Sequence, residues 1–287
     1  MPEMNLKKIE EGLFRVLMFC STVIIATALF LIIFSILYKG LPSVSWEMLT
    51  STPKGGFYFG KGGGVLNAII GSLYLSLGAT ILALIIGLPL ALYMNVHLIK
   101  HQKLVNGIRF MLDLLWGVPS IVYGAFGFTI MIFFGIRASL LAGIFTVTLF
   151  IIPIMVRSMD EVLKSVPRGL LESSLSLGST KAETSYRVYV KQCIPGVITA
   201  VLLSFGRAIG DAASILFTTG YTDYIPTALN QPTATLPLAI FFQLSSPIVE
   251  VQNRAYASAV VLVTIILIIS ILARVFSAKF HKNKINF

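Results

Sequence analysis

Apolar residues in this chain gather into runs of about 20 or more, and a run of that length can cross a lipid bilayer as one helix. A helix is required there because the lipid interior offers no water to backbone N–H and C=O groups. We predict six transmembrane helices, at about residues 15–38, 65–96, 106–134, 140–156, 194–217 and 254–276. Charged residues make up only 12% of the chain, about half the share of a soluble protein. The sequence therefore predicts an all-α, polytopic membrane protein.

Basic residues outnumber acidic ones and give a net charge of +10, and their positions explain the excess. Of the 22 Lys and Arg residues, 16 lie on segments that alternate spans place on one side of the membrane, and five lie on the other side. Lysine and arginine concentrate on the cytoplasmic side of membrane proteins. We therefore predict that both termini are cytoplasmic. The basic charge indicates orientation and not a nucleic-acid partner.

The predicted spans divide the chain into four parts. These are a cytoplasmic N-terminal segment, a first transmembrane helix with its outer loop, a transmembrane domain and a basic cytoplasmic tail, at 1–12, 13–64, 65–276 and 277–287. The first apolar run is too long for a signal-peptide core and lacks a small-residue cleavage site, so we expect it to remain as a span. Cys20 and Cys193 both lie in apolar surroundings, which disfavours a disulfide.

The outer loop ends in a Lys-Gly-Gly-Gly run at 61–64. Such a run is superficially like a phosphate-cradling loop, but no Gly-Lys-Ser/Thr follows and the segment lies on the outer side of the membrane. We interpret it as a flexible joint and predict no nucleotide site on this chain. The same loop carries Trp46, Phe57, Tyr58 and Phe59, which we expect to anchor it at the membrane interface.

A polar cytoplasmic segment at 157–191 separates the fourth and fifth spans. Within it, Ser165 can cap a helix, Pro167 suits a first turn, and Gly178 suits the left-handed residue after a last turn. We predict a short helix at about 165–178. Ser173 and Ser174 are small enough to let another surface approach closely, so the helix could plug into a partner.

Glu172, Ser173 and Ser174, followed by Gly178, resemble the coupling loop of ABC-transporter permeases, whose pattern is Glu-Ala-Ala, three residues, then Gly. Both alanines are serines here, which keeps the small volume. The resemblance implies that these four residues dock into a groove on a cytoplasmic ATPase and receive its motion. The Leu-Pro that usually follows in that family is Val190-Lys191 in this chain.

Arg207 and Asp211 are the charged residues that we place deep in a span. An arginine there costs about 2.5–3.5 kcal/mol on insertion scales and normally faces an aqueous path or a counter-ion. Its guanidinium matches oxyanion oxygens in a two-pronged geometry, and Asp211, one helical turn on, could neutralise it. Two interpretations stay open: a pathway arginine for an anion, or a buried pair that sets helix register. We also expect Arg109 and Asp113 to pair at the inner end of the third span.

Two strings extend the resemblance to the PstA-type phosphate permeases. Arg207-x-x-Gly-Asp-Ala-Ala, with Ile-Leu-Phe-Thr at 215–218, is similar to their Ala-Arg-x-x-Gly-Glu-Thr-Ala-Pro-Leu-Leu-Phe-Thr, and Gly-Val-Pro-Ser-Ile-Val-Tyr-Gly at 117–124 is similar to a string near their pore. The likeness covers roughly 62–276. It implies a type I-like ABC importer permease fold in a bacterial inner membrane, with Arg207 and Asp211 on the substrate pathway and Pro119 and Ser120 lining the pore.

The resemblance also implies a function: a permease subunit that forms half of the pathway of an ATP-driven phosphate importer. The implied partners are a second, PstC-like permease, a dimer of a PstB-like ATPase, an external PstS-like phosphate-binding protein and the lipid bilayer. ATP and Mg would be used by the ATPase, and this chain would bind no cofactor or metal. The alternatives are a permease for sulfate or molybdate, the sister phosphate permease, and an intramembrane enzyme. For an enzyme we find no catalytic motif in the spans and assign no catalytic residue.

Overall fold

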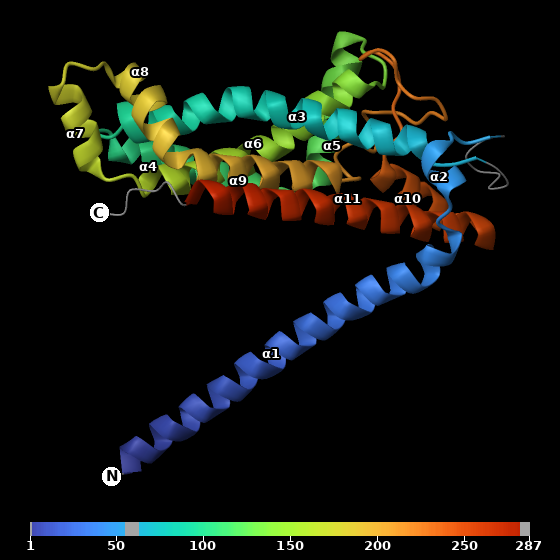
Figure 1. Ribbon diagram of the computed structural model, residues 1–287, viewed down its shortest axis with the longest axis horizontal. Helices are drawn as coiled ribbons and strands as arrows, with labels where there is room; N and C mark the ends of the chain where they lie inside the picture. The colour runs from blue at the N-terminus through green and yellow to red at the C-terminus, as the bar shows by residue number, and fades with distance from the viewer. Residues whose placement is uncertain (1, 55–62, 282–287) are drawn as a thin grey trace.

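The computed structural model describes residues 2–54 and 63–281, and Figure 1 shows a bundle of helices with one long helix standing away from it. Within these ranges the regular structure is helical, apart from one isolated bridge between Pro53 and Gly63. The predicted all-α class is therefore confirmed. The helices are α1 Pro2–Gly40, α2 Trp46–Thr50, α3 Leu66–Leu92, α4 Gln102–Gly117, α5 Ser120–Phe134, α6 Leu140–Lys164, α7 Arg168–Ser176, α8 Lys181–Thr184, α9 Val190–Ile209, α10 Leu236–Leu244 and α11 Val249–His281.

Five of the described helices or helical runs are long and apolar enough to cross a membrane, and a sixth span results if the bent pair α4–α5 is counted as one. Those two helices meet at an angle of 95°, so the continuous third span that we predicted is wrong. The break lies at Val118 and Pro119. Proline lacks the N–H that a helix interior needs, and it disfavours the helical conformation in the residue before it. Val118 is accordingly extended, with φ −71° and ψ 129°.

The centre of the bundle is the long contact between α3 and α6. Small residues on α3 let the two helices approach closely, as small residues do between helices in lipid. A side chain at Gly78 would begin 2.6 Å from Ile144, and one at Gly87 would begin 3.2 Å from Val156. Large side chains such as Met155 and Met159 fill the remaining space and are fully buried. Helices α4 and α5 pack against α6, and α9 packs against both α3 and α6.

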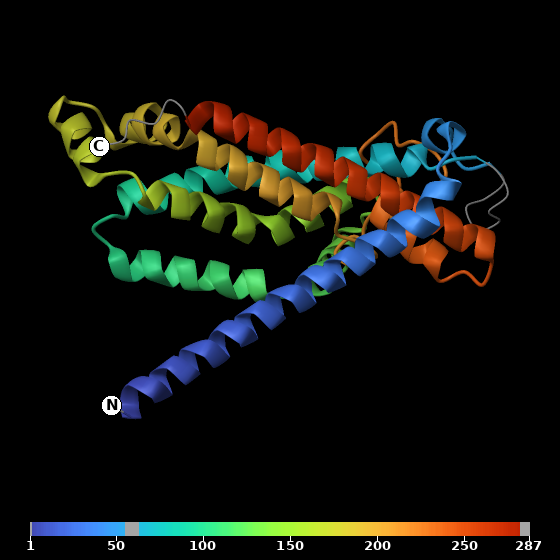
Figure 2. The ribbon, with the colours of Figure 1, turned by 60° about the horizontal axis from the view of Figure 1, so that its bottom comes forward.

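Helix α1 leaves the bundle, and both views show its N-terminal part far from the other helices (Figures 1 and 2). It packs against α11 near its C-terminal end, where a side chain at Gly40 would collide with the backbone of Tyr256. None of the most apolar part of α1 is buried within the chain. Its apolar surface is therefore available to lipid or to another protein.

The described part of the glycine run is packed, which corrects our interpretation of this run as a flexible joint. Gly63 has a φ of +81°, its carbonyl accepts a hydrogen bond of 2.6 Å from Arg254, and Gly64 donates to the carbonyl of Thr52 over 3.2 Å. A side chain at either glycine would collide with neighbouring backbone. Lys61 and the expected interface residues Phe57, Tyr58 and Phe59 lie outside the described residues, whereas Trp46 is exposed.

Three shorter segments depart from regular α-helix, and the first, η1 Leu41–Ser43, is a 3-10 turn after α1. The residues of η2, Tyr93–His97, continue α3 as a π-helical turn, and those of η3, Ser185–Tyr189, join α8 to α9 in the same way. The outer segment between the last two spans contains α10. Its Leu236 amide donates to the Ser72 hydroxyl over 2.8 Å, which fastens this helix to α3.

Candidate functional site

Arg207 lies in the last turn of α9 and is exposed on the surface of the chain. Its guanidinium carbon lies 5.0 Å from the centre of the Phe150 ring on α6, which is a cation–π contact. Within the described residues it forms no ion pair, and in particular none with Asp211. The local neutralisation that we predicted for this arginine is therefore wrong.

Asp211 lies beyond the end of α9, because this helix ends at Ile209 and not near residue 217 as we predicted. The carboxylate is buried and accepts a hydrogen bond of 2.8 Å from the backbone N–H of Ser214. An acidic side chain in this position stabilises a turn by satisfying an amide that would otherwise lack a partner. Since helical spacing is lost after Ile209, Asp211 does not point back to Arg207. The buried pair that would set helix register is thus absent as well.

The two strings of the family resemblance meet in space, although about 90 residues separate them in the chain. Tyr123 packs edge-on against Phe150, with ring centres 5.7 Å apart, and the same Phe150 ring lies against Arg207. A side chain at Gly124 would begin 2.8 Å from the carbonyl oxygen of Ala213 and 2.9 Å from that of Ser214. Only glycine permits this approach of α5 to the segment after Asp211.

Pro119 and Ser120 lie at the break between α4 and α5, the first exposed and the second half-buried. The hydroxyl of Tyr123 donates to the carbonyl of Leu115 over 2.9 Å, which ties the two helices together across this break. Pro119 thus causes the bend, and the hydrogen bond from Tyr123 to Leu115 stabilises it. The pore-lining role of Pro119 and Ser120 stays a prediction.

The polar segment 157–191, which we call the coupling segment, contains α7 where a short helix was predicted, at one end of the bundle (Figure 1). Gly178 follows the helix with a φ of +85°, as expected for a left-handed residue, and donates to the carbonyl of Leu175 over 3.0 Å. The predicted cap is wrong: the Ser165 hydroxyl donates to Val162 over 2.7 Å at the end of α6, and Pro167 occupies the N-cap position of α7. Ser165 therefore ends the preceding helix and does not begin this one.

The exposed tip of this segment is preorganised by α8. The hydroxyls of Ser174 and Thr184 lie 2.9 Å apart, and Thr180 with Glu183 forms a reciprocal capping box at the start of α8. Glu172 and Ser173 are exposed on α7, and Leu177 beside them is 87% exposed. Glu172, Ser173 and Leu177 are thus exposed on a firmly held support. The docking role of this tip stays a prediction.

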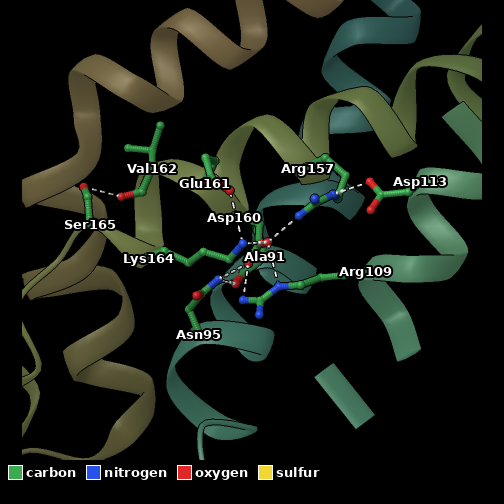
Figure 3. Close-up of polar contacts among 10 residues, drawn as sticks. All are labelled: Ala91, Asn95, Arg109, Asp113, Arg157, Asp160, Glu161, Val162, Lys164 and Ser165. Carbon is green, nitrogen blue, oxygen red and sulfur yellow. Dashed lines mark hydrogen bonds and ion pairs between the residues drawn. The ribbon is translucent and has the colours of Figure 1, made fainter. Parts of the chain in front are cut away.

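A cluster that we did not predict lies near the C-terminal end of α6 (Figure 3). Asp160 is fully buried, and Arg109 of α4 binds both of its oxygens, at 2.9 and 3.0 Å. Asn95 of η2 donates to the same carboxylate over 2.9 Å, and Arg157 donates to it over 2.9 Å. The Nζ of Lys164 lies 3.3 Å from it. We call these residues, with Asp113, the Asp160 cluster.

Asp113 forms the rim of the Asp160 cluster. It accepts a hydrogen bond of 2.6 Å from Arg157, which corrects the predicted pairing of Arg109 with Asp113. Arg157, Asp160 and Lys164 are spaced three and four residues apart, and this spacing was the available signal. We assigned them to a polar segment because the apolar run ends at Val156, although α6 continues to Lys164. Among the described residues, no three His, Cys, Asp or Glu side chains gather as metal ligands.

Comparison with known families and relatives is consistent with this architecture. Residues 87–282 match the family described as binding-protein-dependent transport system inner membrane component. A phosphate transport system permease protein PstA from Yersinia pestis is 35% identical over 252 residues, which are 86% of this chain and 83% of the relative. The protein of the same name from Pasteurella multocida is 32% identical, over 85% of this chain and 86% of its own length.

Solved structures share the fold. Inward-facing conformations of the MetNI methionine ABC transporter include a chain that superposes with a TM-score of 0.63 and 18% identity, over 75% of this chain and 95% of that one. An amino acid ABC transporter solved with histidines gives a TM-score of 0.54 and 20% identity, over 75% of this chain and 92% of that one. At such identities the likeness concerns the arrangement of helices alone.

Proposed function

Since the chain belongs to the family of binding-protein-dependent transport system inner membrane components and, within it, to the PstA-type phosphate permeases, we propose that it is the transmembrane permease subunit of an ATP-driven phosphate importer. The observation that carries this proposal is the 35% identity to a PstA protein across 86% of the chain. The apolar helices make it a multi-pass membrane protein. The permease would form half of the translocation pathway.

The chain works within an ABC transporter that also needs a partner permease and an ATPase. We propose a PstC-like second permease, a PstB-like ATPase dimer and an external PstS-like phosphate-binding protein as these partners. ATP and Mg would be used by the ATPase, and this chain would take part through its coupling segment. The start of α1 and the end of α11 point toward the end of the bundle that carries α7 and α8, which supports cytoplasmic termini (Figure 2).

Arg207 is the residue that we propose for phosphate on the pathway. Its guanidinium is exposed, is held against the Phe150 ring and has no carboxylate partner among the described residues. An unpaired arginine at membrane depth calls for an anion or for water, and its planar fork fits phosphate oxygens. Asp211 supports the turn that brings residues 213–214 against Gly124 beside this site. It therefore shapes the pathway without binding Arg207.

Phosphate uptake tests the proposed function. Membranes that lack only this chain should take up no phosphate through the transporter, and restoring the chain should restore uptake. Extra copies of the second permease should not replace it, because the two subunits would form different halves of the pathway. Uptake of sulfate or molybdate should not depend on the chain. If the chain restored uptake of one of these anions and not of phosphate, the proposed substrate would be wrong.

Gly178 tests the coupling role, with Gly169 as its matched control. Both glycines of this segment are exposed and have open space where a side chain would begin, but only Gly178 has a positive φ. Gly178→Ala should therefore strain the end of α7 by about 1–2 kcal/mol, whereas Gly169→Ala should not. We expect the phosphate transported per ATP hydrolysed to fall in the first variant alone. Equal ratios in both variants would contradict a coupling role for this end of α7.

A further inference from the structure

A cavity of about 140 Å³ lies beside the Asp160 cluster, between η2, α4, α6, α7 and η3. Three of its lining side chains are cationic, and none of the residues that line it in the described structure is acidic. Its polar and charged lining consists of Asn95, Gln102, Arg109, Lys164, Arg168 and Tyr189. A concave site with one sign of charge concentrates ions of the opposite sign. We call it the inner pocket.

The positive charge of the inner pocket is only partly neutralised. Asp160 is shared by Arg109, Arg157 and Lys164. Arg157 also pairs with Asp113, and Lys164 also pairs with Glu161. Arg168 forms no salt bridge within residues 2–54 and 63–281. These four cations therefore face three carboxylates, of which only Asp160 is buried, so the pocket keeps a net positive charge.

The backbone around the inner pocket also favours a functional, anion-binding site. Both π-helical segments border it, because η2 contributes Asn95 and η3 contributes Tyr189. Such segments are rare and often occur at functional sites. The 16-residue helix α4 also begins at the pocket with Gln102, and no side chain caps its first turn. Its free N–H groups add to the attraction for an anion.

We propose that the inner pocket binds an oxyanion of the phosphate class, as inorganic phosphate or as the phosphodiester of an anionic lipid headgroup. A guanidinium and an ammonium supply the donors that such oxygens prefer. One water needs only about 10–15 Å³ of accessible space, so the pocket has room for a tetrahedral anion and several waters. The choice of inorganic phosphate as one form rests on the proposed function.

A bound oxyanion would join the coupling segment to the bundle. Arg168 is the first residue of α7, whereas Arg109 and Lys164 belong to α4 and α6. The anion would therefore bridge α4, α6 and α7. Without it, the Asp160 cluster connects α4 to α6, and the loop after α6 connects α6 to α7. Occupancy of the pocket should bias the position of the α7 docking surface, and phosphate in the cytoplasm or the lipid composition would thereby regulate coupling.

Direct binding of radiolabelled phosphate tests the inner pocket. The assembled transporter, carrying Arg207→Ala to remove the pathway arginine, is placed in nanodiscs of zwitterionic lipid without its external binding protein. Arg168→Gln should weaken phosphate binding about tenfold to a hundredfold, the value of one charge-assisted hydrogen bond. Arg187→Gln is the control, because Arg187 is an exposed cation of the same segment that does not line the pocket. Arg168 is exposed, so its replacement should not disturb folding.

The lipid form is tested in nanodiscs that contain phosphatidylglycerol, by native mass spectrometry of the lipid retained. If retention depends on Arg168 and not on Arg187, the occupant is a lipid headgroup and the proposal stands in that form. If Arg168→Gln changes neither phosphate binding nor lipid retention, the proposal is wrong. That failure would leave the proposed function intact if restored uptake still depends on the chain. Conversely, pocket binding without uptake would refute the function alone.

Discussion

The chain holds arginines in two contrasting settings on its spanning helices. In the Asp160 cluster, Arg109 binds both oxygens of a carboxylate whose side chain is 0% exposed. Arg207 instead lies on the surface of α9 against an aromatic ring, with no carboxylate bound to it in the described structure. Arg109 thus has a carboxylate partner in the isolated chain, whereas Arg207 has none among the described residues.

This difference separates a structural charge from a functional one. A buried ion pair adds little net stability compared with apolar packing, but the loss of one member leaves the other charge unpaired at high cost. A charge at membrane depth without a counter-ion in its own chain must be solvated by water or paired with another protein or a ligand. We therefore expect the first setting to control assembly and the second to control transport. Substitutions at four residues test this comparison, and a fifth residue serves as a control.

Asp160→Asn should have the largest effect, because it leaves Arg109, Arg157 and Lys164 without their shared carboxylate. We expect a loss of about 3–5 kcal/mol in unfolding free energy and little assembled transporter. The measurement is the thermal unfolding of the purified complex, with the assembled fraction from size-exclusion chromatography. Glu161→Gln is the control: its side chain is 72% exposed, so its pair with Lys164 should contribute less than about 1 kcal/mol. If Asp160→Asn were as stable as this control, the proposed structural role of the Asp160 cluster would be wrong.

Arg207→Ala should come next and should act on rate. Loss of a charge-assisted hydrogen bond of about 1.5–3 kcal/mol predicts phosphate uptake slower by about one to two orders of magnitude, with assembly unchanged. Arg207→Lys should recover part of the rate, since it keeps the charge and loses the fork. Uptake and ATP hydrolysis are measured in reconstituted complex and normalised to the amount assembled. Wild-type uptake by assembled Arg207→Ala would eliminate the pathway role.

Asp211→Ala should have a smaller effect and should act on stability. It removes the acceptor for the Ser214 amide, which contributes about 0.5–1.5 kcal/mol. Asp211→Asn keeps an acceptor oxygen and should assemble like the wild type, because Arg207 loses no partner. Thermal unfolding of the two variants separates these cases. Poor assembly of Asp211→Asn would show that the negative charge itself is needed and would revive a pair with Arg207.

Asp113→Asn should have the smallest effect, although it breaks the shortest ion pair of the cluster. The Asp113 side chain is 50% exposed, and solvent screens its attraction to Arg157. We expect a loss of less than about 1 kcal/mol, to be measured by thermal unfolding beside Asp160→Asn. A loss as large as that of Asp160→Asn would mean that the rim is as essential as the buried centre.

Local sequence determined much of this protein. Apolar runs predicted the spanning helices because the requirement for internal hydrogen bonds in lipid depends only on a stretch of about 20 residues. Gly178 predicted the left-handed end of α7 because φ above zero depends on one residue type. The Val118-Pro119 pair carried the signal for the break between α4 and α5, but the apolar run across it suggested one continuous helix.

Tertiary structure decided which charges meet. Arg109 has Asp113 one helical turn away and binds Asp160, 51 residues on, because packing of α4 on α6 places that carboxylate in a buried site with several donors. Asp211 likewise accepts a hydrogen bond from the Ser214 amide and does not pair with Arg207, because α9 ends at Ile209. Spacing along a helix shows which partners are within reach. Desolvation then favours the partner whose charge is most costly to leave unpaired, and only the packed helices determine which one that is.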